Sequence, residues 1–484
     1  GNFFDPERVD AFLQSGPRMI EFFERETAVK FDAVNAFSDY HPNAPGARAG
    51  GRSILAAPFD GRELGDRFKD LSPPLREITF VGMMINTSRE VQHFFNVTRS
   101  FESAAYVAKR LLQHAGEVAR NGRATRLTNG NALVGRLAKS ALDAGAQIRV
   151  SSPVTALVIE DGRVRGAVIE AAGARRTIRA RRGVVLACGG FPHDVARRAA
   201  LFPHAPDGTA HLSPAPAGNT GDGLRLATSV GGQIQDDLPN AAAWIPVSKV
   251  TYRNGDTGVF PHLIDRYKPG IIAVTRHGVR FVNESNSYHD MGQAMIAVCR
   301  DEPEVAAWLV CDQRAIGRYG LGFAKPFPLP LTPHLRSGYL LKGRSPAELA
   351  ANAGIDAAAL ERTIARFNDD ARNGCDPEFG RGSTAYNRFL GDPENKPNPC
   401  VAALDRGPYY AVKIVLGDLG TFAGIRTDAK ARVLDESCQP ITGLYAVGND
   451  MASVMGGNYP GGGITIGPAM TFGFIAGRHL AGLT

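Results

Sequence analysis

Apolar positions recur at helical spacing in several parts of the chain and predict its longest elements. Residues 6–26, 103–120 and 131–145 each repeat apolar side chains every three or four positions, which predicts three helices. The same spacing predicts a fourth helix over residues 356–372. The third of these segments ends in Gly145, a residue that commonly terminates helices.

Strand patterns follow the third helix. Residues 147–151, 154–160 and 163–170 read as strands, and Asp161-Gly162 predicts a hairpin turn between the last two. Residues 183–190 form an apolar run that ends in Gly-Gly and predicts a buried strand. This order suits a two-dinucleotide-fold flavoprotein, in which such a meander returns the chain to the sheet beside FAD. A generic α/β layer fits the periodicity equally well.

The middle of the chain differs in composition from its two flanks. Residues 237–408 contain both tryptophans and the proline-rich stretch 325–333. Residues 409–484 return to strand, glycine-rich turn and helix. The sequence therefore predicts an inserted domain over 237–408 between two segments of one domain, 1–236 and 409–484.

The composition narrows the classes of function. Glycine accounts for 55 of 484 residues, an excess that suits the tight turns of nucleotide sites. The net charge is +7, but the densest arginine run, residues 175–182, lies among strand-like segments without interleaved aromatic residues. We therefore expect no nucleic-acid partner.

Metal and membrane binding are not indicated either. The six cysteines form no C-x-x-C pair, so we expect no metal site. No apolar run reaches 18 residues, so we expect no transmembrane segment. The widely spaced cysteines suit a reducing compartment, so we expect a cytoplasmic protein. The first residue is Gly rather than Met, so a targeting signal could precede the sequence given.

The strongest chemical signal lies near the C-terminus. Residues 443–450 form a short apolar strand ending in Gly-Asn-Asp, and residues 456–468 form a glycine-rich loop that opens a helix. Such a loop aims free N–H groups at an anion or a carbonyl. A carboxylate at the strand end can bind a sugar or ribityl hydroxyl. We favour a ligand-contact loop over a merely tight crossover.

Two further observations concern nucleotide binding. Residues 218–223, Gly-Asn-Thr-Gly-Asp-Gly, open a predicted helix and could wrap a phosphate. No complete G-x-G-x-x-G lies between a first strand and a first helix, so the usual pyrophosphate loop is absent from this sequence.

The chain resembles the flavoprotein family of fumarate reductase and succinate dehydrogenase, specifically its 3-ketosteroid Δ1-dehydrogenase branch. The similar stretches are 38–42 with 51–53, 186–190, 218–223, 280–284 and 443–473. The resemblance implies an α/β, two-dinucleotide-binding-type FAD domain, incomplete at its N-terminus, with an inserted α+β capping domain. It implies FAD as the cofactor, bound by Gly189, Gly190, Asn219, Thr220, Gly221, Asp222, Gly448, Asn449, Asp450, Gly463, Ile464 and Thr465.

Two positions separate the branches of this family. Fumarate reductases place an arginine five residues after the Asn of the R-F-x-N-E motif, where this chain has Tyr288. They place a second arginine in the C-terminal glycine-rich loop, where this chain has Tyr459. Without those cations a dicarboxylate would not be held, so we expect no fumarate reduction.

The resemblance assigns roles in desaturation of a ring ketone such as a 3-ketosteroid. Tyr459 and the backbone N–H of Gly463 would donate to the substrate carbonyl, and Tyr288 would take a proton from carbon 2. Tyr40 would help Tyr288 to ionise, and flavin N5 would accept a hydride from carbon 1. Preorganised donors stabilise enolate charge, and a phenol of pKa ~10 needs a stabilised anion to act as a base.

Alternatives remain open from the sequence. Steroid enzymes more often have alanine after the tyrosine and proline before the last glycine of Tyr459–Gly463, so a smaller cyclic ketone is also compatible. A related flavin reductase acting on an enone is one alternative function. A cofactor-free binding protein or inactive fragment is another, because the pyrophosphate loop is missing. The expected partners are the ketone substrate and an unidentified electron acceptor, and a separate N-terminal fragment is a further alternative.

Overall fold

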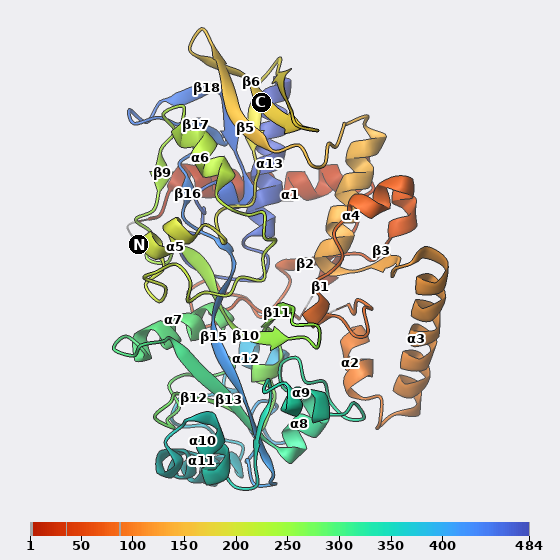
Figure 1. The fold of residues 1–484 in the computed structure, drawn as a ribbon, viewed down its shortest axis with the longest axis vertical. Coiled ribbons are helices and arrows are strands. Elements are labelled where there is room, and N and C mark those ends of the chain that lie inside the picture. Colours follow the sequence, from red (N-terminus) through yellow and green to blue (C-terminus); the bar gives the residue numbers. More distant parts are fainter. Residues whose placement is uncertain (1–2, 35, 87–88, 484) are drawn as a thin grey trace. The chain divides into compact units, whose positions relative to one another are not determined.

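The computed structural model describes residues 3–34, 36–86 and 89–483 and shows a mixed α/β fold (Figure 1). The chain divides into two compact units. Unit 1 comprises residues 1–29, 140–243 and 418–484, and unit 2 comprises residues 30–139 and 244–417. Each unit is therefore assembled from segments that are distant in the sequence.

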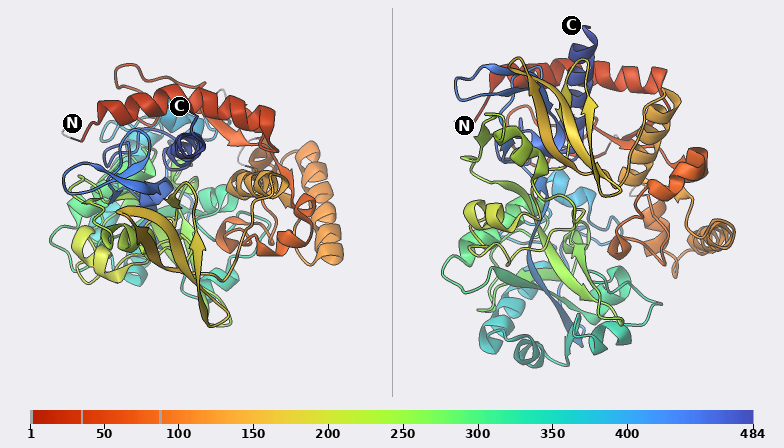
Figure 2. Two further views of the ribbon diagram at one scale, coloured as in Figure 1. Left: turned by 90° about the horizontal axis from the view of Figure 1, so that it is seen from above. Right: turned by 45° about the horizontal axis from the view of Figure 1, so that its top comes forward.

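Unit 1 is built around a small sheet of order β17-β18-β8, in which β18 and β8 run parallel. A separate antiparallel meander has the order β5-β6-β7, and helices α1 and α13 contact each other (Figure 2). Its elements are α1 (Pro6–Glu26), β5 (Val154–Glu160), β6 (Arg163–Ala171), β7 (Ala174–Arg179), β8 (Val184–Leu186), α5 (Val195–Leu201), α6 (Asp222–Thr228), β9 (Ile234–Gln235), β16 (Gly424–Ile425), β17 (Arg432–Leu434), β18 (Pro440–Ala446), the 3-10 turn η4 (Gly448–Asp450) and α13 (Ile466–Ala481).

Unit 2 contains a six-stranded sheet of order β11-β10-β15-β13-β12, with β14 also paired to β15. Its strands are β1 (Phe31–Val34), β2 (Ser53–Ala56), β3 (Phe59–Asp60), β4 (Arg126–Leu127), β10 (Ala242–Thr251), β11 (Thr257–Pro261), β12 (Ile271–Val274), β13 (Ala306–Asp312), β14 (Leu341–Gly343) and β15 (Tyr409–Thr421). Strands β10 and β15 carry the chain between the two units.

The helices of unit 2 include two long ones whose N-termini are capped by side chains. In α3, Ser100 caps the N-terminus and left-handed Gly122 ends the helix; in α11, Asp356 caps the N-terminus. The helices are α2 (Arg89–Phe95), α3 (Phe101–Asn121), α4 (Asn129–Asp143, whose last turn belongs to unit 1), α7 (Tyr288–Val298), α8 (Gln313–Tyr319), α9 (Thr332–Arg336), α10 (Pro346–Ala353), α11 (Ala357–Ala371) and α12 (Ala385–Phe389), with 3-10 turns η1 (Gly61–Asp70), η2 (Arg76–Ile78) and η3 (Asp265–Tyr267).

The hydrophobic core of unit 2 lies between its sheet and two helices. Ile272 of β12 and Val310 of β13 are fully buried against Leu349 of α10 and Leu360 of α11. Burying side chains of this size stabilises the fold by about 1.5–3 kcal/mol each. The apolar spacing that predicts a helix over 356–372 is the face that fills this core.

Most predicted elements are present, and one is wrong. Helix α1 has the predicted bounds, and the hairpin at Asp161-Gly162 joins β5 to β6. No strand is formed over residues 147–151, which the structure describes as irregular and exposed. A strand is held by pairing with a neighbour, and none of the described strand pairings includes these residues. The meander is completed instead by β7, on the other side of β6.

The sequence-based domain boundaries stay a prediction. The structure groups residues 30–139 with 244–417, whereas the sequence predicts that 30–139 belong to the first segment of the FAD domain and 237–408 to the inserted domain. Compactness and cofactor binding are different criteria, so this grouping does not test the predicted roles of the segments. Within the described part of the chain, no helix is long and apolar enough to cross a membrane.

Candidate active site

The predicted cofactor residues that follow β8 and β18 lie in unit 1, where these two parallel strands end at one edge of their sheet. The predicted residues Gly189 and Gly190 follow β8, and Gly448, Asn449 and Asp450 follow β18. Because the strands are parallel, both turns meet at their carboxyl ends, where α/β proteins bind ligands.

Asp450 connects these two turns through hydrogen bonds. Its buried carboxylate accepts hydrogen bonds from the N–H of Cys188 at 2.5 Å and of Gly190 at 2.9 Å. Burial raises the pKa of Asp450. The carboxylate expected to meet a hydroxyl of the cofactor is thus engaged with backbone donors, and a ligand role for it stays a prediction.

The predicted phosphate loop packs against the same turn. Gly221 donates its N–H to the carbonyl of Gly190 at 3.0 Å, and Asn219 Nδ2 donates to the carbonyl of Gly189 at 3.2 Å. Asp222, the first residue of α6, accepts from Thr220 and from Arg225. The structure therefore brings together three sequence-distant segments, 188–190, 219–222 and 448–450, and the contact of the 218–223 loop with a phosphate stays a prediction.

Gly190 is a position where only glycine fits. Its φ is +78°, and a Cβ there would lie 2.1 Å from Thr421 Oγ1 and 2.9 Å from the carbonyl oxygen of Asn449. We expect Gly190→Ala to lose bound flavin and to lower the melting temperature, because backbone strain alone costs about 1–3 kcal/mol. Flavin absorbance per protein and a thermal melt measure this.

The matched control is Gly317→Ala. A Cβ at Gly317, inside α8, meets no atom within 4 Å, and alanine is the better helix former. Full flavin content and unchanged melting of Gly190→Ala would contradict the assignment of this turn.

The glycine-rich loop before α13 has room and donors for a ligand. Gly463 has a φ of +86°, and nothing lies within 4 Å of where its Cβ would be. Helix α13 has no side-chain cap at Thr465 and no acidic residue in its first turn. Its leading N–H groups therefore suit a carbonyl or an anion. These residues fit the carbonyl-bearing ring or the phosphates of a flavin nucleotide.

Tyr459 is held within this loop. Its side chain is buried, with its ring centroid 6.3 Å from that of Phe422. The loop is anchored where Asn240 Nδ2 donates to the carbonyl of Gly457 at 2.9 Å. Tyr459, Gly463, Ile464 and Thr465 thus lie in one fixed turn of unit 1.

Two predicted tyrosines meet in unit 2. The hydroxyls of Tyr40 and Tyr288 share a hydrogen bond of 3.0 Å, and both side chains are buried. Their rings are edge-to-face at 86°, with centroids 5.6 Å apart. These residues are 248 positions apart in the sequence, so the fold alone brings them into contact.

Tyr288 is the first residue of α7, whose N-cap is Ser287. The N-terminus of a helix favours negative charge on nearby groups. Burial raises the pKa of Asp290 in the first turn. Tyr288 therefore combines a position at the start of α7 with a hydroxyl partner, Tyr40.

A second pair of tyrosines, which the sequence did not reveal, packs beside the first. The ring of Tyr386 lies 4.6 Å from that of Tyr40, and its hydroxyl is 2.6 Å from that of Tyr267. Arg266 Nη2 donates to the Tyr267 hydroxyl at 2.8 Å. Burial raises the pKa of both Tyr267 and Tyr386, so they stay protonated and support Tyr40. Only the adjacent Arg266-Tyr267 could have hinted at this cluster.

Two residues of the R-F-x-N-E motif, which precedes α7, belong to a buried ion-pair cluster. Arg280 forms paired hydrogen bonds with Glu284 at 2.8 and 2.9 Å and with Asp376 at 2.8 and 2.9 Å. Burial alone would raise the pKa of Glu284, but Arg280 and Arg381 outweigh it and lower that pKa to about 2. The motif fixes the segment from which Tyr288 projects.

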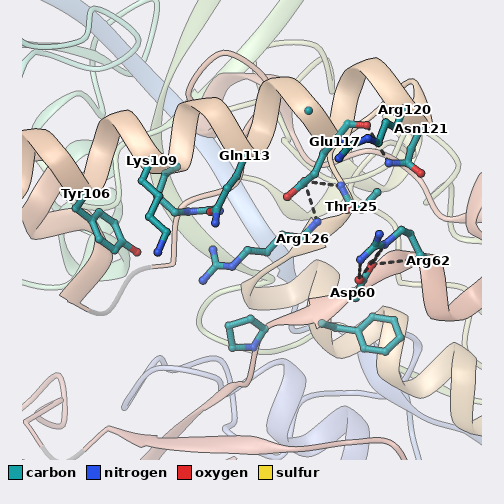
Figure 3. Close-up of a pocket in the computed structure, with 14 residues that line it drawn as sticks. Asp60, Arg62, Tyr106, Lys109, Gln113, Glu117, Arg120, Asn121, Thr125 and Arg126 are labelled. Atoms are coloured by element: carbon teal, nitrogen blue, oxygen red, sulfur yellow. Dashed lines mark hydrogen bonds and ion pairs between the residues drawn. The ribbon is translucent and has the colours of Figure 1, made fainter.

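A cavity of about 650 Å³ in unit 2 contains none of the predicted site residues (Figure 3). It lies between α3 and the segment around Asp60 and Arg62, which pair with each other. Glu117 accepts from the N–H groups of Thr125 and Arg126 at its wall. The Asp60 and Glu117 carboxylates of this cavity are therefore bound to neighbouring residues. The predicted site residues lie outside the cavity. No group of three or more metal-ligating side chains occurs among the described residues.

Comparison with known proteins decides the family. The family model described as FAD binding domain matches residues 1–466. The chain belongs to this family. It is an FAD-dependent oxidoreductase with the expected α/β FAD-binding fold, and the cofactor-free alternative is wrong. Within the family it belongs with the fumarate reductase-like flavoproteins, on the 3-ketosteroid Δ1-dehydrogenase-like branch.

Three proteins with known names are similar to this FAD-dependent oxidoreductase in sequence or structure. It is 45% identical, over 99% of its length and 81% of the relative's, to 4-oxocyclohex-2-ene-1-carboxylate 5-dehydrogenase of Sinomonas cyclohexanicum. It is 38% identical, over 99% and 85%, to 3-oxosteroid 1-dehydrogenase of Mycobacterium tuberculosis H37Rv. The crystal structure of 3-ketosteroid Δ1-dehydrogenase from Sterolibacterium denitrificans with 1,4-androstadiene-3,17-dione matches with a TM-score of 0.90, 32% identity and coverage of 100% and 86%.

Proposed function

We propose that this FAD-dependent oxidoreductase introduces an α,β double bond into a ring ketone, with a 3-ketosteroid as the leading substrate. The observation that carries the proposal is the hydrogen-bonded Tyr40–Tyr288 pair at the N-terminus of α7. Relatives named for a 3-oxosteroid and for a 4-oxocyclohexene carboxylate support the ketone class. FAD, when bound, supplies the acceptor for the hydride that leaves carbon 1.

The proposed base is Tyr288. A C–H bond next to a carbonyl releases its proton when the resulting enolate charge is stabilised. Tyr288 takes the proton from carbon 2, and Tyr40 donates its hydrogen bond to the Tyr288 oxygen as that oxygen carries negative charge. The N-terminus of α7 stabilises the same charge. Both effects lower the cost of ionising a phenol near neutral pH.

The proposed electrophile is formed by Tyr459 and Gly463. The Tyr459 hydroxyl and the Gly463 N–H donate to the substrate carbonyl, where negative charge develops. The burial of Tyr459 supports this role, because a donor shielded from water stabilises such charge more strongly. The positive φ of Gly463 sets the direction of its N–H.

The roles of the two units follow from these assignments. Every residue proposed to hold FAD belongs to unit 1, whereas Tyr40 and Tyr288 belong to unit 2. We propose that residues 237–408 act as a capping domain that excludes water from the reaction.

The test of the electrophile is Tyr459→Phe. With a Δ4-3-ketosteroid and an artificial electron acceptor, we expect kcat to fall about 10²–10³-fold, as for loss of one donor in an oxyanion hole. Flavin content should be unchanged. The control is Tyr445→Phe, which removes a hydroxyl bonded to His479 at 2.7 Å in the same unit. Wild-type turnover by Tyr459→Phe would remove this residue from the mechanism.

Comparing kcat/KM for two ketones tests which class of ring ketone is the substrate. The holoenzyme is assayed with 4-androstene-3,17-dione and with 4-oxocyclohexanecarboxylate at equal concentration. A higher kcat/KM for the steroid supports the leading substrate. A higher value for the carboxylate would replace it with a small ring ketone and leave the tyrosine roles intact.

A further inference from the structure

Helix α3 carries an apolar stripe on its exposed side. Its inner face packs through Ser103, Val107, Arg110 and His114, which are buried. The opposite face is exposed at six positions spaced alternately by four and three residues: Phe101, Ala105, Ala108, Leu112, Ala115 and Ala119. This spacing is that of the contact positions of a coiled coil. Phe101 and Leu112 are 90% and 76% exposed.

The figures place α3 at the outer edge of its unit. It is the isolated long helix at the right of Figure 1, and both views of Figure 2 also put it at the margin. Its 21 residues extend about 31 Å at 1.5 Å per residue. This length is sufficient for several successive layers of side-chain contacts along a pair of helices.

We propose that the stripe pairs antiparallel with the same helix of a second copy of this chain, forming a weak two-fold dimer. In such a pair each large side chain meets a small one. Phe101 lies opposite Ala119 of the second copy, and Leu112 opposite Ala108. Ala105 lies opposite Ala115, and these small pairs allow close approach of the two helices. A two-fold axis repeats every contact, which is what a self-complementary surface requires.

The charges beside the stripe fit the same register. Glu102 of one copy lies near Arg120 of the other, and the axis gives this pair twice. Both side chains flank the stripe on one side of α3, and Arg120 is exposed. Such rim pairs mainly select orientation. Lys109, near the axis, is exposed and can extend its ammonium into solvent.

A membrane surface is the less suitable occupant. Four of the six stripe residues are alanine, which contributes little apolar area to insertion, whereas small residues are what closely packed helices use. One pair of 21-residue helices is a small contact compared with the ~800 Å² per partner of a standard interface, so the dimer is reversible.

The experiment is sedimentation velocity of the flavin-loaded protein over a range of concentrations. Leu112→Glu should weaken self-association at least tenfold while flavin content stays unchanged, because the mutated residue is exposed. The matched control is Leu13→Glu on α1, where a leucine that is also largely exposed, at 63%, lies off the stripe. We expect Leu13→Glu to associate as the wild type does.

Charge reversal tests the register. Glu102→Arg and Arg120→Glu should each weaken association, and the double variant should restore it, since both pairs are re-formed in reverse. A wild type that stays monomeric up to the highest concentration overturns the proposal, as does association insensitive to Leu112→Glu. Failure of the double variant to recover overturns the antiparallel register, and wild-type binding to phosphatidylglycerol vesicles that Leu112→Glu abolishes would assign the stripe to a membrane instead.

Discussion

Tyr288→Phe abolishes exchange of the carbon-2 proton with solvent and lowers kcat about 10²–10⁴-fold, the usual contribution of a general base. The substitution removes one oxygen and keeps the ring that packs against Tyr40. The measurement is loss of deuterium from a 2-deuterated ketone, followed by NMR, together with steady-state turnover. Flavin content should not change, because every proposed flavin ligand lies in unit 1.

Two further variants make this result specific. Tyr40→Phe should retain slow exchange and shift the pH profile of kcat to higher pH, because the Tyr288 anion then lacks its donor at 3.0 Å. Tyr319→Phe, whose hydroxyl binds Asp392 in the same unit, is the control and should leave exchange unchanged. Persistent exchange in Tyr288→Phe would mean that another group is the base.

Arg280→Met destabilises unit 2 by about 3–5 kcal/mol, the range for removing one partner of a buried ion pair. Arg280 is almost completely buried and is bonded to both Glu284 and Asp376, so its removal leaves two carboxylates without this cation. Chemical denaturation of the holoenzyme measures the loss. The control is Arg372→Met, whose pair with Asp369 is largely exposed; it should change stability by less than about 1 kcal/mol.

The same cluster predicts how stability depends on acid. The pKa of Glu284 is about 2, below its ordinary value. The ionised carboxylate therefore stabilises the fold above its ordinary pKa, and that stabilisation is lost as the pH falls toward 2. Wild type should lose stability across this window more steeply than Glu284→Gln. Equal slopes would show that the carboxylate is not tied to the fold as described.

The sequence was sufficient for features that depend on local pattern. The bounds of α1, the Asp161-Gly162 hairpin and the strand into Gly189-Gly190 follow from periodicity and turn residues. It failed at residues 147–151, because an apolar alternation does not reveal whether a neighbouring strand exists. It also gave no indication that Asp450 would be engaged with the N–H groups of Cys188 and Gly190.

The sequence by itself determined the family, the cofactor and which residue types replace the fumarate reductase arginines, because these are carried by short motifs whose chemistry is local. Only the tertiary structure decided that Tyr40 lies 3.0 Å from Tyr288, that Tyr267 and Tyr386 support the pair, and that α3 leaves an apolar stripe exposed. The tyrosine contacts join segments that are distant in the sequence, and the stripe is defined by which face of α3 stays exposed. Both depend on how the whole chain packs.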